Sequence, residues 1–532
     1  MNDEKEIREK TMIKPRIFIK NIIFNDGTVL ELGHDSIVIF TGANNSGKSQ
    51  VLKDIELCIR PNVSAFKVLR KAEYEYCGNI NEENFLRERF SRDVAGKYVL
   101  SGFGGVFTIN DLMRFWTNHT LYNGLDNLFV KRLSTEMRLV VSNSLQRNDQ
   151  PESHPIYKIY KSESLAQKLS NYFYQAFSED LVVNRNEMQT IPLHVGKAPN
   201  KTKYTIDKQD DYYSQVDALP KLQEQGDGMR SFASILLDTF ASNYSITLID
   251  EPEAFLHPPQ ARVLGKMLAK NNPEGRQLFL STHSEDFLQG LLDADSENVI
   301  VVRINRVNNI NNMKILKTDD IRSLWSNPIL RYSNILSGIF HTKVVVCESD
   351  YDCLFYQALI NAIYEIKSEV APDILFTHCG GKCRIKDVIK ALKAVDVPVM
   401  AICDFDILND SRNIKEILKS FGYKWDNIAD KMKIIYDEMN GKSGVGEDAW
   451  SQIKRIGKTG FTGDAPAAYE IVETECRKIG LYIVPVGEME CFDKTVNKEK
   501  KDWVYHVLEK YNLATESKLE EARKFVQAVV DF

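Results

Sequence analysis

The order of apolar and polar positions along the chain predicts two α/β domains in succession. In the first part, apolar strands are expected at 16–22, 36–41, 245–250 and 277–281, and helices at 229–240 and 259–270. From residue 343 the alternation starts again, with strands at 343–347, 373–377 and 397–403 and helices at 351–366 and 384–394. Strands that alternate with helices are typical of a mostly parallel sheet covered by helices.

The remaining segments set the expected domain limits. Residues 61–220 mix aromatic-rich helical stretches with polar loops, and we expect a helical insertion there that takes part in dimerisation. Residues 306–320 are rich in Asn and Lys and indicate a connector or a polar hairpin. Residues after 407 are expected to be mostly helical, with one strand at 481–486. We therefore predict domains at 1–340 and 341–532.

Composition and charge narrow the class of protein. The 532 residues are 43% hydrophobic and 27% charged, which is ordinary for a globular chain. The formal charge of 68 − 74 = −6 argues against a uniformly basic nucleic-acid coat but leaves room for a local basic groove. No apolar run reaches membrane-spanning length, the first residues are too charged for a signal peptide, and nine scattered cysteines favour free thiols. A cytoplasmic location without membrane contact is expected.

A glycine-rich loop follows the strand at 36–41 and opens a helix. It reads Gly42, Ala43, Asn44, Asn45, Ser46, Gly47, Lys48, Ser49, which is a complete P-loop pattern. Glycines let backbone N–H groups face the phosphates of ATP, Lys48 is placed to reach the terminal phosphates, and Ser49 is placed to bind Mg²⁺. The alternative is an ordinary glycine-rich turn that binds no ligand. The strand before the loop and the helix after it argue against that alternative.

An acidic pair ends the strand at 245–250. Asp250 is placed to hold Mg²⁺ and Glu251 to polarise the attacking water of ATP hydrolysis. Taken alone, the pair could be an ordinary acidic cap of a strand. With a P-loop upstream in the same chain, the catalytic interpretation is favoured.

Further motifs resemble the ABC-type ATPases of the SMC and RecF group. Asp250-Glu251-Pro252-Glu253 with His257-Pro258 resembles their Walker B segment, and Gln225–Ser231, with Gly226 and Gly228, stands where they have the signature motif. Leu280–Ser284 resembles their switch segment, with His283 as the γ-phosphate sensor. The resemblance implies that a second subunit completes each ATP site, and hence a homodimer.

A second acidic set follows the strands of the second domain. Glu348 and Asp352 come after the strand at 343–347, and Asp404 and Asp406 come after the strand at 397–403. Carboxylates at the carboxyl ends of parallel strands converge at one edge of a sheet, where they repel one another unless cations neutralise them. Hard oxygen ligands select Mg²⁺ or Mn²⁺. Alternatively, Asp404 and Asp406 could lie in a solvent-exposed loop without binding a cation.

This acidic set resembles a Toprim domain. The Glu-Gly-x-x-Asp motif of that family is met by residues 348–352, with Ser349 in the glycine position, and the Gly-Gly-Lys loop by 380–382. Residues 487–490 resemble a later acidic motif, so that Glu488 or Glu490 would complete a two-metal site. The resemblance also implies a lysine near the scissile phosphate, with four candidates: Lys382, Lys454, Lys458 and Lys494.

The order of ABC-type head and Toprim domain, over roughly residues 16–500, resembles the OLD family of ATP-dependent nucleases. The resemblance implies an ATP-regulated, metal-dependent DNA endonuclease or nickase, similar to the antiphage effectors of Gabija and retron systems. ATP could license or restrain cleavage. Two alternatives stay open: a sensor or scaffold held on a partner such as a reverse transcriptase with its DNA product, and a repair ATPase that binds DNA ends without cutting.

Overall fold

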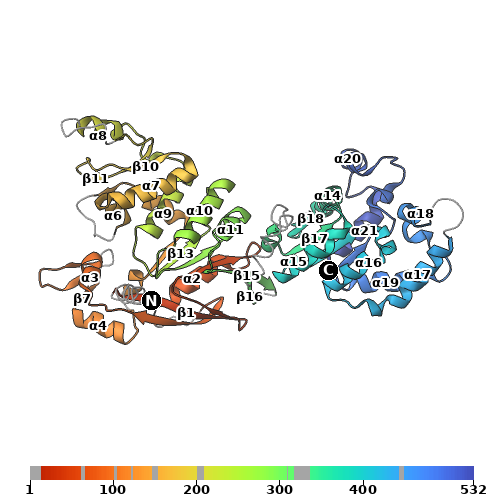
Figure 1. Cartoon of the computed structure of the whole chain (residues 1–532), viewed down its shortest axis with the longest axis horizontal. Coiled ribbons are helices and arrows are strands. Elements are labelled where there is room, and N and C mark those ends of the chain that lie inside the picture. Colours follow the sequence, from red (N-terminus) through yellow and green to blue (C-terminus); the bar gives the residue numbers. More distant parts are fainter. Residues whose placement is uncertain are drawn as a thin grey trace. The chain divides into compact units, whose positions relative to one another are not determined.

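The computed structural model describes residues 14–60, 66–100, 105–121, 124–146, 154–200, 209–307, 310–316, 336–442 and 449–532. The chain divides into two units, residues 1–318 and 319–532, and each is described by itself (Figure 1). Both units are built on parallel sheets with helices, which confirms the α/β class. No helix within the described ranges is both long enough and apolar enough to cross a membrane.

The first unit contains a six-stranded sheet. In sheet order its strands are β16 (Ile310–Leu316), β15 (Val299–Val307), β3 (Ile37–Thr41), β14 (Gln277–Ser281), β13 (Ile246–Asp250) and β8 (Val130–Leu133). All neighbours are parallel except β15 and β16. In register, Ser281 pairs with Asp250 on one side and with Phe40 on the other. The carboxyl ends of β3, β13 and β14 therefore lie along one edge.

A second, antiparallel sheet belongs to the same unit. It consists of β2 (Val29–Glu31), β1 (Arg16–Phe24) and β4 (Leu69–Cys77), with β1 in the middle. Four apolar residues of β1 are buried in one core cluster with Val38 and Phe40 of β3. Four helices accompany the two sheets: α2 (Lys48–Cys58), α9 (Asp227–Phe240), α10 (Pro258–Asn271) and α11 (Glu285–Leu292).

The described residues of the segment 61–220 form both helices and strands. Its helices are α3 (Glu83–Arg89), α4 (Ile109–Thr117), α5 (Thr135–Val141), α6 (Pro155–Lys161) and α7 (Glu163–Phe177), with α8 (Gln209–Asp217). It also contributes β4 and β8 to the two sheets of the first unit. Its short strands are β5 (Phe90–Arg92), β6 (Tyr98–Leu100), β7 (Val106–Phe107), β9 (Leu145–Gln146), β10 (Asp180–Val183), β11 (Thr190–Ile191) and β12 (Leu193–Gly196).

The second unit has a four-stranded parallel sheet. Its order is β18 (Ile374–His378), β17 (Lys343–Cys347), β19 (Val399–Cys403) and β20 (Leu481–Ile483). The three strands at 343–347, 373–377 and 397–403 are confirmed to within two residues. The fourth is shorter than expected. All four carboxyl ends lie at one edge, which is where the acidic motifs follow.

Helices complete the second unit, as expected for the region after residue 407. They are α14 (Asp350–Lys367), α15 (Ile385–Ala394), α16 (Ser411–Phe421), α17 (Ala429–Lys442), α18 (Ala449–Ile456), α19 (Ala465–Arg477), α20 (Lys500–Lys510) and α21 (Glu520–Val530). Trp503 of α20 is fully buried and packs in the core with Phe355 of α14, with ring centroids 5.2 Å apart. This packing fixes the start of α20 relative to the sheet.

Candidate functional sites

The P-loop runs from the end of β3 into α2 and adopts a conformation that requires glycine. Gly42 and Gly47 have φ values of 142° and 106°, and Asn45 lies in the left-handed region at 61°. A Cβ atom on Gly42 would stand 2.2 Å from the carbonyl oxygen of Ile304 in β15. Only glycine allows so close an approach. Lys48 donates to the carbonyl oxygens of Gly42, at 2.8 Å, and Ala43, at 2.9 Å.

The predicted magnesium pair of the ATPase unit is brought together. Ser49 at the start of α2 donates through Oγ to Asp250 Oδ1 at 2.8 Å. Ser281 at the end of β14 donates to the same carboxylate oxygen. Because these residues follow or end adjacent strands, the sheet register sets their separation. Ser281 belongs to the expected switch segment, but the sequence did not mark it as a partner of Asp250.

The candidate base and sensor also lie beside each other. His283 Nδ1 stands 3.4 Å from Glu251 Oε1 and 3.7 Å from Glu253 Oε1. Glu253 is buried and accepts hydrogen bonds from Thr282 Oγ1 at 2.7 Å and from the His283 N–H at 3.2 Å. Burial raises the pKa of the Glu253 carboxyl. Glu253 therefore ties the Walker B segment to the switch segment.

Arg138 of α5 is a buried residue of this site that the sequence did not reveal. It donates to the carbonyl oxygens of Asp250, at 2.8 Å, and Glu251, at 3.0 Å. Burial lowers the pKa of the guanidinium to about 10, against the pull of the nearby carboxylates. The backbone of α5 is held in turn by α9, because Arg230 donates to the Leu139 carbonyl at 2.7 Å and Ser234 to that of Arg138.

The expected signature glycines stand at the start of α9. Gly226 is the N-cap residue of this helix, and a Cβ atom there would meet open space. A Cβ atom on Gly228 would stand 2.6 Å from the carbonyl oxygen of Phe255. The glycine-rich turn therefore packs directly against the segment that follows β13.

In the second unit, three of the predicted motifs meet at the carboxyl edge of the sheet. Glu348 follows β17, and its Oε1 accepts a hydrogen bond from the backbone N–H of Asp404 at 3.0 Å. The Glu348 carbonyl oxygen accepts from the Gly381 N–H at 3.0 Å. The strand β19 ends at Cys403, and residues 405–409 form a 3₁₀ turn, so Asp404 and Asp406 do not extend the strand. In this turn, the side chains of Asp404 and Asp406 still face lysines of the site.

Asp404, like Asp352, is a buried carboxylate of this site. Its side chain is 7% exposed, and Lys500 Nζ at the start of α20 stands 3.3 Å from Asp404 Oδ2. Burial and the neighbouring Glu348 raise the pKa of Asp404 well above its usual range. Burial disfavours the charge on Lys500, but the surrounding carboxylates, Asp404 first, outweigh it and raise the pKa of Lys500.

Two of the four candidate lysines contact the acidic residues. Lys382 Nζ lies 3.1 Å from Asp406 Oδ2, and Lys454 Nζ lies 2.8 Å from Glu488 Oε1 and 3.8 Å from Asp406 Oδ2. The ion pairs of the described residues do not include Lys458 or Lys494 with these carboxylates. A third lysine, Lys500, also contacts a carboxylate of the site and was not among the candidates from the sequence.

Asp352 has a structural role as well. Its Oδ2 accepts from the Ser349 N–H and Oγ, each at 2.9 Å, and forms a capping box at the start of α14. Ser349, in the position where the motif has glycine, thus caps the helix. The other oxygen, Asp352 Oδ1, is buried and has no hydrogen-bond partner in the part of the chain described. Burial raises the pKa of the Asp352 carboxyl.

The acidic cluster consists of the oxygen ligands that a divalent cation prefers, but among the described residues no three of its ligand atoms all lie within 4.8 Å of one another. Its members are Glu348, Asp352, Asp404, Asp406, Glu488 and Glu490. These six carboxylates face three lysines, which leaves a formal charge of 3 − 6 = −3 if all are ionised. One oxygen each of Asp352, Asp406 and Glu490 is buried without a hydrogen-bond partner among the described residues. Buried, unpaired carboxylate oxygens are the ligands that Mg²⁺ and Mn²⁺ take.

Comparison with known proteins gives two domain matches. Residues 209–288 match the AAA_21 family of AAA domains, whose description refers to the AbiEii toxin and type IV toxin–antitoxin systems. Residues 339–406 match the Toprim domain of proteins like the overcoming lysogenization defect protein, abbreviated OLD. An OLD nuclease of Thermus scotoductus is 27% identical over 175 residues, which cover 30% of this chain and 30% of that protein. The chain thus aligns with about a third of the length of that relative.

Solved structures of SMC heads give distant matches. An SMC head bound to the C-terminal winged-helix domain of ScpA has 11% identity and a TM-score of 0.33 over 57% of this chain and 99% of that one. The SMC head domain of Thermotoga maritima has 12% identity and a TM-score of 0.31 over 57% of this chain and 98% of that one. A likeness at these TM-scores is too distant to carry an argument.

Replacing Asp404 by Asn should stabilise the metal-free protein. The pKa of Asp404 is raised in the folded state, so its ionised form is less favourable there than in the unfolded chain. Above the usual carboxyl range this group therefore lowers the free energy of unfolding; the loss shrinks as the pH falls below the raised pKa and vanishes at the ordinary carboxyl pKa. At neutral pH with a chelator, we expect Asp404→Asn to raise Tm by a few degrees, at about 2–4 °C per kcal/mol.

Thermal melts of wild type, Asp404→Asn and Asp437→Asn check this expectation. Asp437 is exposed on α17, so its variant should leave Tm unchanged. A Tm for Asp404→Asn below that of wild type in the chelator would mean that its pair with Lys500 is net stabilising, and would contradict the account of a repulsive cluster.

Proposed function

We propose that this chain, which joins an AAA-type ATPase domain to a Toprim domain of the OLD-like family, is an ATP-regulated, metal-dependent DNA endonuclease or nickase. The two domain matches confirm the resemblance to the OLD family that the motifs of each half indicate. The observation that carries the proposal is the meeting of acidic motifs from three strand ends, with lysines, at one edge of the second sheet.

The acidic cluster supplies what cleavage of a phosphodiester needs from the protein. Glu348, Asp404 and Asp406 would hold one divalent cation, with Asp352, Glu488 and Glu490 available for a second. Bound Mg²⁺ or Mn²⁺ activates water and stabilises the leaving oxygen in such sites. Lys382, Lys454 and Lys500 lie among these carboxylates and can contact the phosphate oxygens of DNA once cations neutralise the acids.

The ATPase unit would provide regulation. Lys48 and the backbone of the P-loop would hold the phosphates, with Ser49 and Asp250 on Mg²⁺, and Glu251 and His283 on the attacking water and γ-phosphate. The glycines at the start of α9 would face the ATP of a second copy of the chain, in a homodimer or higher homo-oligomer. Arg138 and α5 connect Asp250 with α9, so this contact can respond to the bound nucleotide.

An antiphage role is the biological setting that the resemblance favours. The combination of ATPase and Toprim domains resembles the effectors of Gabija and of some retrons. A reverse transcriptase with its DNA product is therefore a candidate partner. The cysteines within the described residues are all free, which is compatible with a reducing cytoplasm.

Two other functions remain as alternatives, and a specific observation favours one of them. The glycine-rich turn at 225–231 departs from the common signature form, which favours a sensor or scaffold held on a partner. A DNA-end-binding repair ATPase would need a Toprim domain that no longer cuts. The complete acidic set speaks against the second of these, and a cleavage assay separates the nuclease from both.

Loss of Asp404 and Asp406 together should abolish cleavage. We expect the purified chain to nick or linearise plasmid DNA with Mg²⁺ or Mn²⁺, and Asp404→Ala with Asp406→Ala to reduce the rate by at least about a hundredfold, because both cation ligands are lost. Agarose gels with a time course measure the rate.

A matched double variant, Asp426→Ala with Asp437→Ala, removes two exposed carboxylates of the same unit and should cut like wild type. Undiminished cleavage by the Asp404/Asp406 variant would overturn the site. DNA binding without cleavage by wild type, at any nucleotide state, would instead favour the scaffold or repair function.

Lys48→Ala should abolish ATP binding and leave the fold intact. Lys48 is the only side-chain cation of the P-loop and would lose its contact with the terminal phosphates. Titration with a fluorescent ATP analogue measures this, and Lys53→Ala, an exposed lysine on α2, is the control. ATP binding by Lys48→Ala that equals wild type would refute the P-loop assignment. The same variant in the plasmid assay reveals whether ATP licenses or restrains cutting.

A further inference from the structure

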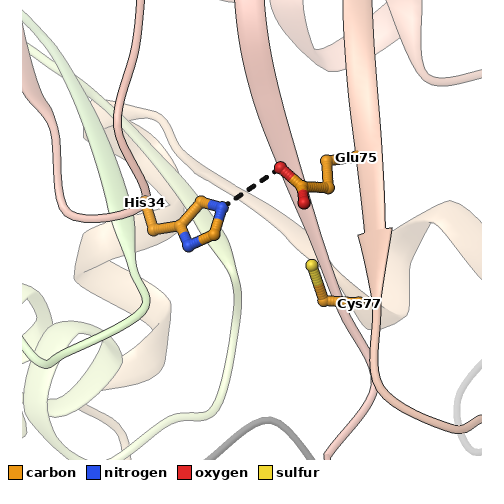
Figure 2. A group of neighbouring side chains, drawn as sticks. All are labelled: His34, Glu75 and Cys77. Atoms are coloured by element: carbon orange, nitrogen blue, oxygen red, sulfur yellow. Dashed lines mark hydrogen bonds and ion pairs between the residues drawn. The ribbon is translucent and has the colours of Figure 1, made fainter. Parts of the chain in front are cut away.

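A cluster of three metal-binding side chains stands on the antiparallel sheet of the first unit, outside both sites described above. Glu75 and Cys77 are two residues apart on β4, so their side chains point to the same face of the sheet. His34 lies in the loop between β2 and β3 and faces them (Figure 2). One ligand atom of each residue lies within 4.8 Å of the others.

The imidazole of His34 is held in place by its neighbours. Its ring stacks on Phe18 of β1, with centroids 4.0 Å apart and an angle of 17° between the rings. His34 Nε2 stands 3.3 Å from Glu75 Oε2, and Phe18 is the register partner of Glu75 across the two strands. The ring orientation is therefore fixed before any ligand arrives, which lowers the cost of binding.

An ion pair alone does not account for the cluster. Lys20 Nζ lies 3.6 Å from Glu75 Oε2 and partly neutralises that carboxylate, so His34 and Glu75 could form a surface pair without a metal. The thiol of Cys77 lies within hydrogen-bond reach of the Glu75 carboxylate and adds a sulfur ligand that an ion pair does not need, and Figure 2 shows this sulfur turned toward the carboxylate and the imidazole. All three side chains are partly exposed, so an ion from solution can reach them.

We propose that His34, Glu75 and Cys77 bind one transition-metal ion of the zinc class. Nitrogen, oxygen and thiolate sulfur together are the ligand set of Zn²⁺, which takes four ligands in tetrahedral geometry. A water molecule would fill the fourth position. The sulfur ligand disfavours Mg²⁺, so this site is chemically distinct from the P-loop and the acidic cluster. Binding releases the thiol proton of Cys77 to solvent, because the thiolate is the ligand.

The site would tie together two parts of the ATPase unit. A bound ion would join the end of β4 to the loop at 32–36, which leads directly into β3. The P-loop follows the other end of β3, so the ion would not touch ATP. Its effect on the ATPase would be structural, through the fixed position of the strand that carries the P-loop.

Cobalt spectroscopy of the full chain tests the proposal. Co²⁺ substitutes for Zn²⁺, and its bond to a thiolate gives a charge-transfer absorption that oxygen ligands do not give. With excess Mg²⁺ present to fill the oxygen sites, we expect one Co²⁺ per chain with this absorption, and its loss on addition of Zn²⁺. Cys77→Ser should remove the band, and His34→Ala or Glu75→Gln should weaken binding by at least about tenfold, since even outer-sphere partners contribute that much.

Cys383→Ser is the matched control, because Cys383 is exposed in the other unit. That variant should keep the band. Glu75→Gln preserves the size of the side chain, so weaker binding by this variant cannot be attributed to the cavity that His34→Ala would leave. Melting curves without metal establish that each variant is folded. A wild-type protein without a thiolate–cobalt band, or a band that persists in Cys77→Ser, would overturn the proposal and leave the nuclease assignment untouched.

Discussion

The second unit depends on one electrostatic constraint, which is that carboxylates gathered at the edge of a parallel sheet repel one another when water is excluded. Glu348 and Asp404 come to this edge because their strands, β17 and β19, are parallel neighbours whose carboxyl ends coincide. Burial raises the pKa of both. Lysines from three separate segments only partly compensate. In the proposed nuclease, divalent cations would supply the remaining positive charge, so that cleavage and metal dependence would have the same physical origin.

In the first unit, hydrogen bonds stabilise an acidic side chain at the edge of the six-stranded sheet. Asp250 accepts hydrogen bonds from Ser49 and Ser281, so its charge is shared with two hydroxyl groups, one at the start of α2 and one at the end of β14. The buried guanidinium of Arg138 binds the carbonyl oxygens at the same strand end and connects it, through α5, to α9. The nucleotide site and the helix that begins with the glycine-rich turn are consequently parts of one hydrogen-bonded network. In the proposed dimer, this network is where ATP would alter the contact with a second copy of the chain.

The sequence revealed the parts of the two sites that lie directly after an apolar strand. The P-loop and Glu348 follow such strands, so strand and motif could be recognised together. Lys500 could not be found in this way, because 96 residues separate it from Asp404 and the packing of α20 alone brings it there. Arg138 was hidden for a similar reason, within a segment expected to be a helical insertion. The short, half-polar β8 in that segment carries no strand pattern of its own, and only pairing with β13 defines it.

The central claim is that the acidic edge of the second sheet binds the divalent cations used in cleavage. A crystal structure of the full chain grown with Mn²⁺, with anomalous diffraction data collected near the manganese edge, tests this most directly. The account predicts an anomalous peak coordinated by Glu348, Asp404 and Asp406, with Lys382 displaced from Asp406. Well-ordered density in which the lysine ion pairs persist and no anomalous peak lies among these carboxylates would contradict it.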